Sequence, residues 1–332
     1  MIINKAILHI LDFNSDVCVF SQRELDFSND AIRIFIEKHL ERIQLDSNRK
    51  HGTFNQQSSF VPILQNYLHG HSDIISFSTL LGNKLHEQIL NSDRLDSTDF
   101  LVVDFSNENV RYIALLLLMN RVAYTHQVVN NSGKIYNELI RHYAILPSVS
   151  QKIESYAIVD CSTFSVDFLD KKRMIDGQDT FVLPDRLLEC SSSISSKEAI
   201  KTINQIASKV AENHGVNSAI MISKAKNYLR ENAEISSSFS PHELGKDVFA
   251  DSEIMKSDFE RHINEANLPS DIKITKSAAV RTGKNHKIKT DTGIEIIFPV
   301  EYFENHEYIE FVNNPDGTIS IQLKNIGKII NK

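Results

Sequence analysis

The last sixty residues place the strongest constraint on the fold of this chain. Two stretches rich in β-branched residues flank the run Asn-Asn-Pro-Asp-Gly at positions 313–317, which is a strong hairpin signal. Pro315 fixes φ where the turn begins, and Gly317 adopts a positive φ at low cost. A further stretch with many β-branched residues spans positions 286–299. The sequence therefore predicts a compact β unit at the C-terminal end.

Length and composition limit the class of protein. The 332 residues are enough for two or three domains, and 41% apolar residues support ordinary buried cores. No stretch approaches the roughly 18 uninterrupted apolar residues of a membrane span, and the first residues lack the pattern of a signal peptide. The three cysteines are widely spaced, which disfavours a disulfide framework or a zinc knuckle. We therefore expect a cytoplasmic protein with no membrane contact.

The region 4–168 combines strand and helix patterns. Amphipathic spacing predicts helices at 29–43 and 77–90, whereas 46–59 is polar and is predicted to be a loop. Neighbouring strands joined by short polar turns predict an antiparallel sheet with helices on one face. The predicted strands are 6–11, 17–20, 100–105, 110–120, 121–129, 156–159 and 164–169, with a turn at 130–133.

Beyond a serine-rich boundary near residue 190, the pattern changes to helices. Ser195 and Glu198 have the spacing of a capping box, and Ser240 followed by Pro241 combines an N-cap with a proline at the first helical position. The predicted fold class is α+β, with an N-terminal mixed antiparallel sheet with helices, a central helical segment and a small C-terminal β unit. The corresponding domains are residues 1–190, 191–269 and 270–332.

The central helices admit two interpretations. Helices at 217–230, 240–250 and 252–267 could form a unit similar to a helix-turn-helix. The first two are separated by about ten residues, however, and the last carries more acids than cations, which does not suit a helix that approaches phosphates. We expect instead a bundle that packs against the sheets or forms a contact in a homodimer.

Charge is distributed unevenly near the C-terminus. The net charge is −7, but residues 272–290 carry six cations and no acid, and residues 291–310 carry six acids and no lysine or arginine. A local stripe of cations can neutralise several phosphates and give weak, salt-sensitive affinity without sequence preference. Alternatively, the basic segment pairs with the acidic one inside the protein. Both interpretations stay open at this point.

Motifs for catalysis, cofactors and metals are weak or missing in the sequence. There is no Gly-rich phosphate loop and no nucleophile elbow. His69 and His71 are close in sequence but lack a helical partner or a nearby thiolate. Cys18 and Cys161 lie in apolar strand contexts, where thiols are usually inert, and His9 is expected to be a packed or hydrogen-bonded strand residue. We predict no catalytic, cofactor-binding or metal-binding residue and no cofactor.

One enzymatic alternative is a magnesium-dependent nuclease. Such enzymes hold Mg²⁺ with clustered carboxylates and use a lysine near the attacked phosphate. Carboxylates near predicted strand ends fit this pattern, although such spacings also arise by chance in an acidic protein. The residues concerned are Asp99, Asp104, Asp160, Asp167, Asp170, Lys172, Asp271 and Lys273.

Both ends of the chain carry a family resemblance. The opening Ile-Asn-Lys-Ala-Ile-Leu-His-Ile-Leu-Asp at 3–12 and the C-terminal stretches 286–299 and 309–326 resemble the bacterial 37-kDa nucleoid-associated protein family. The resemblance is specific at the two ends, looser between them, and extends over the whole chain. It implies a cytoplasmic protein at the bacterial nucleoid, bound to DNA or to proteins that act on DNA.

The leading hypothesis is direct, sequence-independent binding of double-stranded DNA through the basic segment. Residues 281–289 include Gly283 and Asn285 and are predicted to form a mobile loop whose cations follow the phosphate backbone. The alternative is an interaction protein that reaches the nucleoid through a DNA-acting partner. It is favoured by the net −8 of residues 1–270, which remains when the +1 of residues 271–332 is separated from the total of −7. The predicted DNA-binding residues are Lys273, Lys276, Arg281, Lys284, Lys287 and Lys289.

Overall fold

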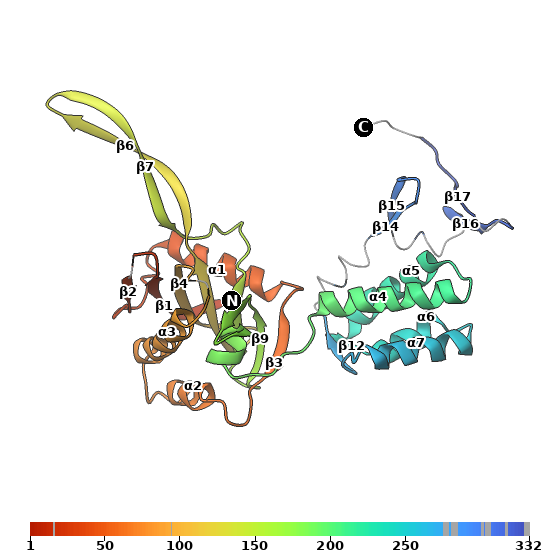
Figure 1. The fold of residues 1–332 in the computed structure, drawn as a ribbon, viewed down its shortest axis with the longest axis horizontal. Coiled ribbons are helices and arrows are strands. Elements are labelled where there is room, and N and C mark those ends of the chain that lie inside the picture. The colour runs from red at the N-terminus through yellow and green to blue at the C-terminus, as the bar shows by residue number, and fades with distance from the viewer. Residues whose placement is uncertain are drawn as a thin grey trace. The chain divides into compact units, whose positions relative to one another are not determined.

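A computed structural model of the chain shows an α+β protein, which confirms the predicted fold class (Figure 1). It describes residues 1–15, 17–93, 95–274, 279, 285–299, 302, 307–315 and 318–328. The chain forms two compact units, Met1–Ser193 and Ile194–Lys332.

An antiparallel sheet of seven strands organises the first unit. Its strand order is β2-β1-β4-β5-β8-β9-β3, and each neighbouring pair runs antiparallel. The predicted strands are present, but the one predicted at 121–129 is not part of this sheet and pairs in a separate hairpin. The long apolar runs form the neighbouring strands β4 and β5. The bounds are β1 Ile2–Asp12, β2 Val17–Val19, β3 Lys50–Thr53, β4 Thr98–Asn107, β5 Val110–Met119, β8 Ser155–Asp160 and β9 Ser165–Leu169.

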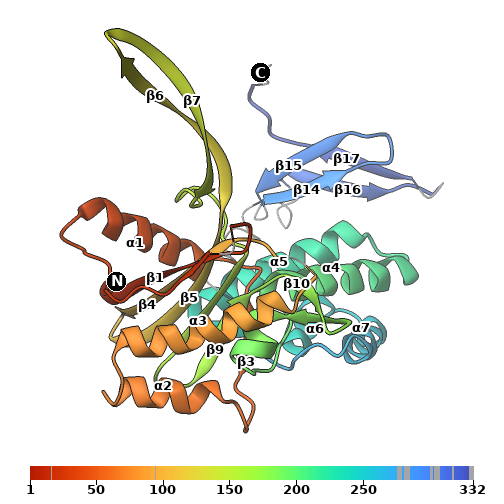
Figure 2. The same cartoon turned by 60° about the vertical axis from the view of Figure 1, so that its left-hand side comes forward.

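Helices cover both faces of this sheet, so the prediction of helices on one face was wrong. Helix α1 (Asp30–Gln44) packs on the face that includes Leu101 and Leu116, whereas α2 (Phe60–Leu68) and α3 (Ile74–Leu90) pack on the face that includes Val102 and Leu115. Figure 2 shows α1 and α3 on opposite sides of the sheet. The physical reason is that β4 and β5 are apolar at successive positions, and both faces of such strands must be buried.

Several elements of the first unit were not predicted. Strand β3 lies inside the segment that was predicted to be a polar loop, and α2 follows it directly. A small hairpin of β10 (Lys172–Ile175) and β11 (Gln178–Phe181) leads into η1 (Val182–Leu187), one turn of π-helix. The next residues, 189–193, run along the free side of β3, and we call them the exit segment.

A long hairpin extends from the first unit. Strand β6 (Arg121–Asn131) pairs with β7 (Lys134–Ile145) to form a two-stranded sheet of their own, and both views show it as an extended ribbon (Figures 1 and 2). We call this hairpin the arm. The turn predicted at 130–133 is present, with Ser132 and Gly133 at positive φ.

The second unit begins with a helical bundle. Helix α4 packs against α5 and α7, and α6 packs against the same two helices around one apolar core. Ser195 and Glu198 form the predicted capping box, and Ser240 caps α6 ahead of Pro241. No helix in the described ranges is long and apolar enough to cross a bilayer. The bounds are α4 Ser196–Asn213, α5 Ser218–Ile235, β12 Ser238–Phe239, α6 Pro241–Val248, α7 Glu253–Glu265 and β13 Ile272–Lys273.

Two hairpins follow the bundle and form the predicted C-terminal β unit. Phe298 and Ile309 are buried there, and the cluster around them includes Ala219 and Ile220 of α5. The last hairpin has the predicted pairing, whereas positions 316 and 317 of its turn lie outside the described residues. The bounds are β14 Asn285–Lys289, β15 Glu295–Pro299, β16 Ile309–Asn313 and β17 Ile319–Leu323.

Candidate nucleic-acid interface

Three of the six predicted DNA-binding cations lie in the part of the chain that the structure describes. Lys273 ends β13 and is exposed, and Lys287 and Lys289 are exposed on β14. The other three, Lys276, Arg281 and Lys284, lie outside the described residues.

Pairing of β14 with β15 fixes the direction of the two β14 lysines. Ile288 lies opposite Ile296, and both contribute to the packed cluster of the β unit. Because side chains alternate along a strand, Lys287 and Lys289 occupy the opposite face. The prediction of a mobile loop was therefore wrong for residues 285–289, which form a strand because their alternating apolar residue has a packed partner across the hairpin.

Part of this cationic face is paired with acids. Lys287 Nζ lies 2.8 Å from Glu295 Oε2, which matches the alternative in which the basic and acidic segments neutralise each other. Elsewhere in the β unit, Lys324, after β17, forms an ion pair with Glu310 of the acidic segment. The side chains of both pairs are 36–55% exposed, and such surface pairs contribute only about 0–1 kcal/mol. A phosphate can therefore compete for either lysine at little cost.

Helix α4 carries a second cationic surface, which we did not predict. Lys197, Lys201 and Lys209 are exposed on it at spacings of four and eight residues. Lys197 and Lys201 border a shallow hollow, and none of the described residues that line it is acidic. They are Lys197, Ile200, Lys201, Asn204, Gln205, Ser208 and Ile222. The repeated four-residue spacing of cations on an amphipathic helix was the sequence signal for this surface.

The carboxylates of the nuclease alternative do not come together. Among the described residues, no group of three or more His, Cys, Asp or Glu side chains is arranged to hold a metal ion, and this includes His69 and His71. Asp104 is almost fully buried and accepts hydrogen bonds from Tyr67 at 2.6 Å, from Arg111 at 2.6 Å and from Asn4 at 3.0 Å. The carboxylate oxygens of Asp104 are therefore engaged in hydrogen bonds within the protein and do not face a metal site.

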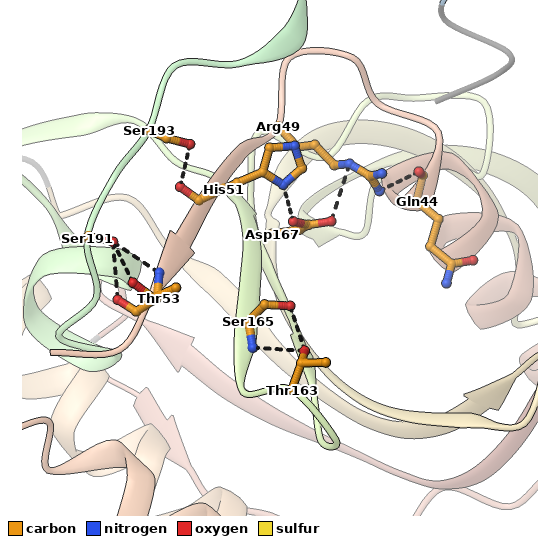
Figure 3. A network of polar contacts seen from close by, with 9 residues as sticks. All are labelled: Gln44, Arg49, His51, Thr53, Thr163, Ser165, Asp167, Ser191 and Ser193. Carbon is orange, nitrogen blue, oxygen red and sulfur yellow. Dashed lines mark hydrogen bonds and ion pairs between the residues drawn. The ribbon is translucent and has the colours of Figure 1, made fainter. Parts of the chain in front are cut away.

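Three further aspartates have separate structural roles. Asp160 accepts hydrogen bonds from the backbone amides of the turn after β8. Asp170 accepts one from the Leu183 amide at 2.8 Å. Asp167, on β9, binds His51 Nδ1 and lies 3.5 Å from Arg49 Nε (Figure 3).

Figure 3 shows how the pair formed by His51 and Asp167 is held at the edge of the sheet. The Ser193 hydroxyl donates to the backbone oxygen of His51 at 2.8 Å, and the Ser191 hydroxyl bonds to Thr53. A histidine and aspartate pair resembles the base of a hydrolase, but these two serines bind the backbone and side chains of β3 and not the imidazole. The network therefore fastens β3 to β9 on one side and to the exit segment on the other.

Burial strongly shifts the pKa values of His9, Cys161 and Cys190, whereas Cys18 is exposed. His9 bonds to Ser78 Oγ at 2.9 Å and accepts from the Ser21 amide at 3.0 Å, and burial lowers the pKa of His9 to about 4. This confirms the predicted structural role of His9. Burial also raises the pKa values of the Cys161 and Cys190 thiols to about 12, so neither thiol is ionised near pH 7.

Comparison with known proteins gives one family. A family model described as "Nucleoid-associated protein YejK" matches residues 7–331, nearly the whole chain. None of the curated proteins compared with the chain matches it.

Proposed function

The chain belongs to the YejK family of nucleoid-associated proteins, and from that membership we propose that it binds double-stranded DNA directly and with little sequence preference. The proposed contact is the basic segment of the C-terminal β unit. The observation that supports it is the exposed pair Lys287 and Lys289 on one face of β14, within a stretch of six cations and no acid. Lysines on a strand face act as point charges for phosphates and do not read base edges.

In this proposal the protein acts at the nucleoid without catalysing a reaction. Contacts to phosphates release counterions, so the logarithm of the affinity falls linearly with the logarithm of the salt concentration. The small number of cations predicts a shallow slope and weak binding. Neither a metal ion nor a cofactor is needed for such contacts.

A second candidate is a protein that reaches the nucleoid through a DNA-acting partner. The ion pair of Lys287 with Glu295 favours it, because it already neutralises part of the basic segment. The net charge of −7 favours it as well, since most of the surface would repel DNA.

Charge reversal on β14 distinguishes the two candidates. We expect Lys287→Glu combined with Lys289→Glu to weaken binding of a duplex of about 20 base pairs and to reduce the salt slope by about one for each lost phosphate contact. The matched control combines Lys38→Glu with Lys171→Glu. These lysines are exposed, each forms an ion pair in the first unit as Lys287 does with Glu295, and the change in net charge is the same.

Fluorescence anisotropy across a salt series is the measurement, with and without Mg²⁺. Equal affinity of the two double variants, or no binding of the original chain at low salt, would refute direct binding through this segment. A lower melting temperature with unchanged DNA association would support the partner-mediated candidate. Cleavage of the duplex only with Mg²⁺ would instead support a nuclease.

A further inference from the structure

The arm lacks the support that a two-stranded ribbon normally needs. Isolated hairpins are at best marginally stable in water unless more strands or a packed face support them. Strands β6 and β7 pair only with each other, and no arm residue joins a hydrophobic core in the part of the chain that is described. The hairpin, with strands of eleven and twelve residues, therefore needs a packing partner on one of its faces.

One face of the arm carries its most exposed large apolar side chains. The strand register places alternate residues of β6 and β7 on this face, because directly opposite side chains point the same way. Five large side chains on it are 61–80% exposed, and we call their side the apolar face. They are Tyr124, Val128, Ile135, Leu139 and Tyr143.

The opposite face of the arm is different. Its apolar residues are less exposed: Ala123, Val129 and Ile140 are only partly exposed, and Tyr136, opposite Val129, is 42% exposed. This face also carries Glu138, the one acidic residue between positions 121 and 145. The exposed apolar surface is thus concentrated on one side, where the five large side chains are 61–80% exposed. Such patches mark contact with another protein surface.

We propose that the apolar face docks onto the same face of a second copy, with the two arms antiparallel around a two-fold axis. Taking about 150–250 Å² for a whole large side chain, the exposed parts of the five residues amount to roughly 600 Å² per copy. Two copies then remove about 1,200 Å² from water, the lower limit for a specific interface. The apolar face is large enough for a weak, reversible dimer.

The charges on the apolar face select the antiparallel arrangement. Arg141 is its only Lys, Arg, Asp or Glu residue, and it stacks on Tyr143 with 4.7 Å between the guanidinium carbon and the ring centre. Parallel arms would place Arg141 against its own copy. Antiparallel arms centred on Leu139 instead place Arg141 against the row of Asn137, whose amide oxygen accepts a hydrogen bond.

The same face does not suit a nucleic acid. Phosphate binding calls for several cations, and this face offers one arginine among five large apolar side chains. A second copy covers the apolar side chains and leaves the arginine hydrogen-bonded. The inference is independent of whether the C-terminal β unit binds DNA.

The solution mass of variants tests the proposal. We expect the original chain to show a concentration-dependent mass between 37.8 kDa and about twice that value in sedimentation equilibrium. Leu139→Glu, at an 80% exposed position, should remain at the monomer mass with an unchanged circular dichroism spectrum. The matched control Thr125→Glu adds the same charge on the opposite face and should dimerise like the original chain.

Disulfide trapping tests the arrangement itself. In a Cys18→Ser background, chains with Tyr143→Cys should cross-link to chains with Ile135→Cys, because the two positions lie four residues on either side of Leu139 on β7. Neither variant should cross-link with itself. Self-linking of the Tyr143→Cys variant would overturn the antiparallel arrangement. A monomeric original chain at all concentrations, or equal dimerisation of Leu139→Glu, would overturn the proposal.

Discussion

Replacing Arg111 with methionine tests how much one buried carboxylate contributes to the stability of the seven-stranded sheet. Asp104 is 1% exposed and receives hydrogen bonds from Arg111, Tyr67 and Asn4. Removing one partner of a fully buried pair costs about 3–5 kcal/mol, because the remaining charge stays buried. The Arg111 side chain is 42% exposed, so solvent screening reduces the expected loss to about 2–3 kcal/mol.

The matched control is Arg33→Met on α1. Arg33 is 44% exposed and its guanidinium lies 2.7 Å from Asp30, so the arginine and the short contact resemble those of Arg111. The difference is the carboxylate, because Asp30 is 78% exposed and keeps its hydration when the arginine is lost. We therefore expect a much smaller loss of stability from this variant.

Hydrogen exchange of the slowest β4 and β5 amides is the suitable assay, because the two compact units need not melt in one transition. A loss of 2–3 kcal/mol should accelerate this exchange by about 30- to 150-fold in Arg111→Met. It should also lower the melting temperature of the first unit by about 5–10 °C. Equal acceleration in the two variants would refute the reasoning, since burial of the carboxylate would then have no effect.

The same network makes the stability of the first unit depend on pH in the acid range. Burial raises the pKa of Asp104, but hydrogen bonds from Arg111, Asn4 and Tyr67 outweigh this and hold the net pKa below its ordinary value. Stabilisation from Asp104 is therefore complete above the unfolded pKa of about 4 and is lost as pH falls through the folded pKa. In Arg111→Met, acid unfolding should begin at a higher pH.

Three further predictions concern other sites. The free energy of unfolding should fall by about 3 kcal/mol as pH falls from about 6.5 to 4, because in this range His9 takes up a proton only in the unfolded chain. His9→Gln should flatten this pH dependence, measured by urea titrations at several pH values. Gly52→Ala should cost about 1–3 kcal/mol or more by thermal melting, since its Cβ would lie 2.2 Å from the backbone oxygen of Ser191, whereas Gly215→Ala meets no atom within 4 Å and carries only the positive-φ cost of about 1 kcal/mol. Ser195→Ala should lower the stability of the second unit by about 1 kcal/mol by removing the cap of α4, measured as loss of helical signal in urea.

Elements with local signals could be predicted from the sequence. The capping box of Ser195 and Glu198 and the start of α6 at Pro241 depend on residues within one helical turn, so tertiary contacts do not change them. The hairpin of β16 and β17 likewise follows from its turn residues and β-branched flanks.

The missed features depend on contacts between distant segments. Strand β3 is short and polar and exists because β9 and the exit segment bind it on its two sides. The second helical layer was missed although the continuous apolar runs of β4 and β5 required it.

For the candidate site, the basic residues could be found from charge alone. The pairing of Lys287 with Glu295 could not, because it depends on the register of β14 with β15.

The exit segment has a consequence for dividing the chain into fragments. Ser191 and Ser193 donate backbone hydrogen bonds of 2.8 Å to Thr53 and His51, and they occupy the side of β3 that ends the sheet. An exposed strand edge is a template for pairing with other chains and hence for aggregation. A fragment ending at residue 187 would leave that edge bare and should precipitate, whereas one ending at residue 194 keeps it covered. We therefore expect the exit segment to prevent aggregation by covering the edge of β3, and not merely to connect the sheet to the helical bundle.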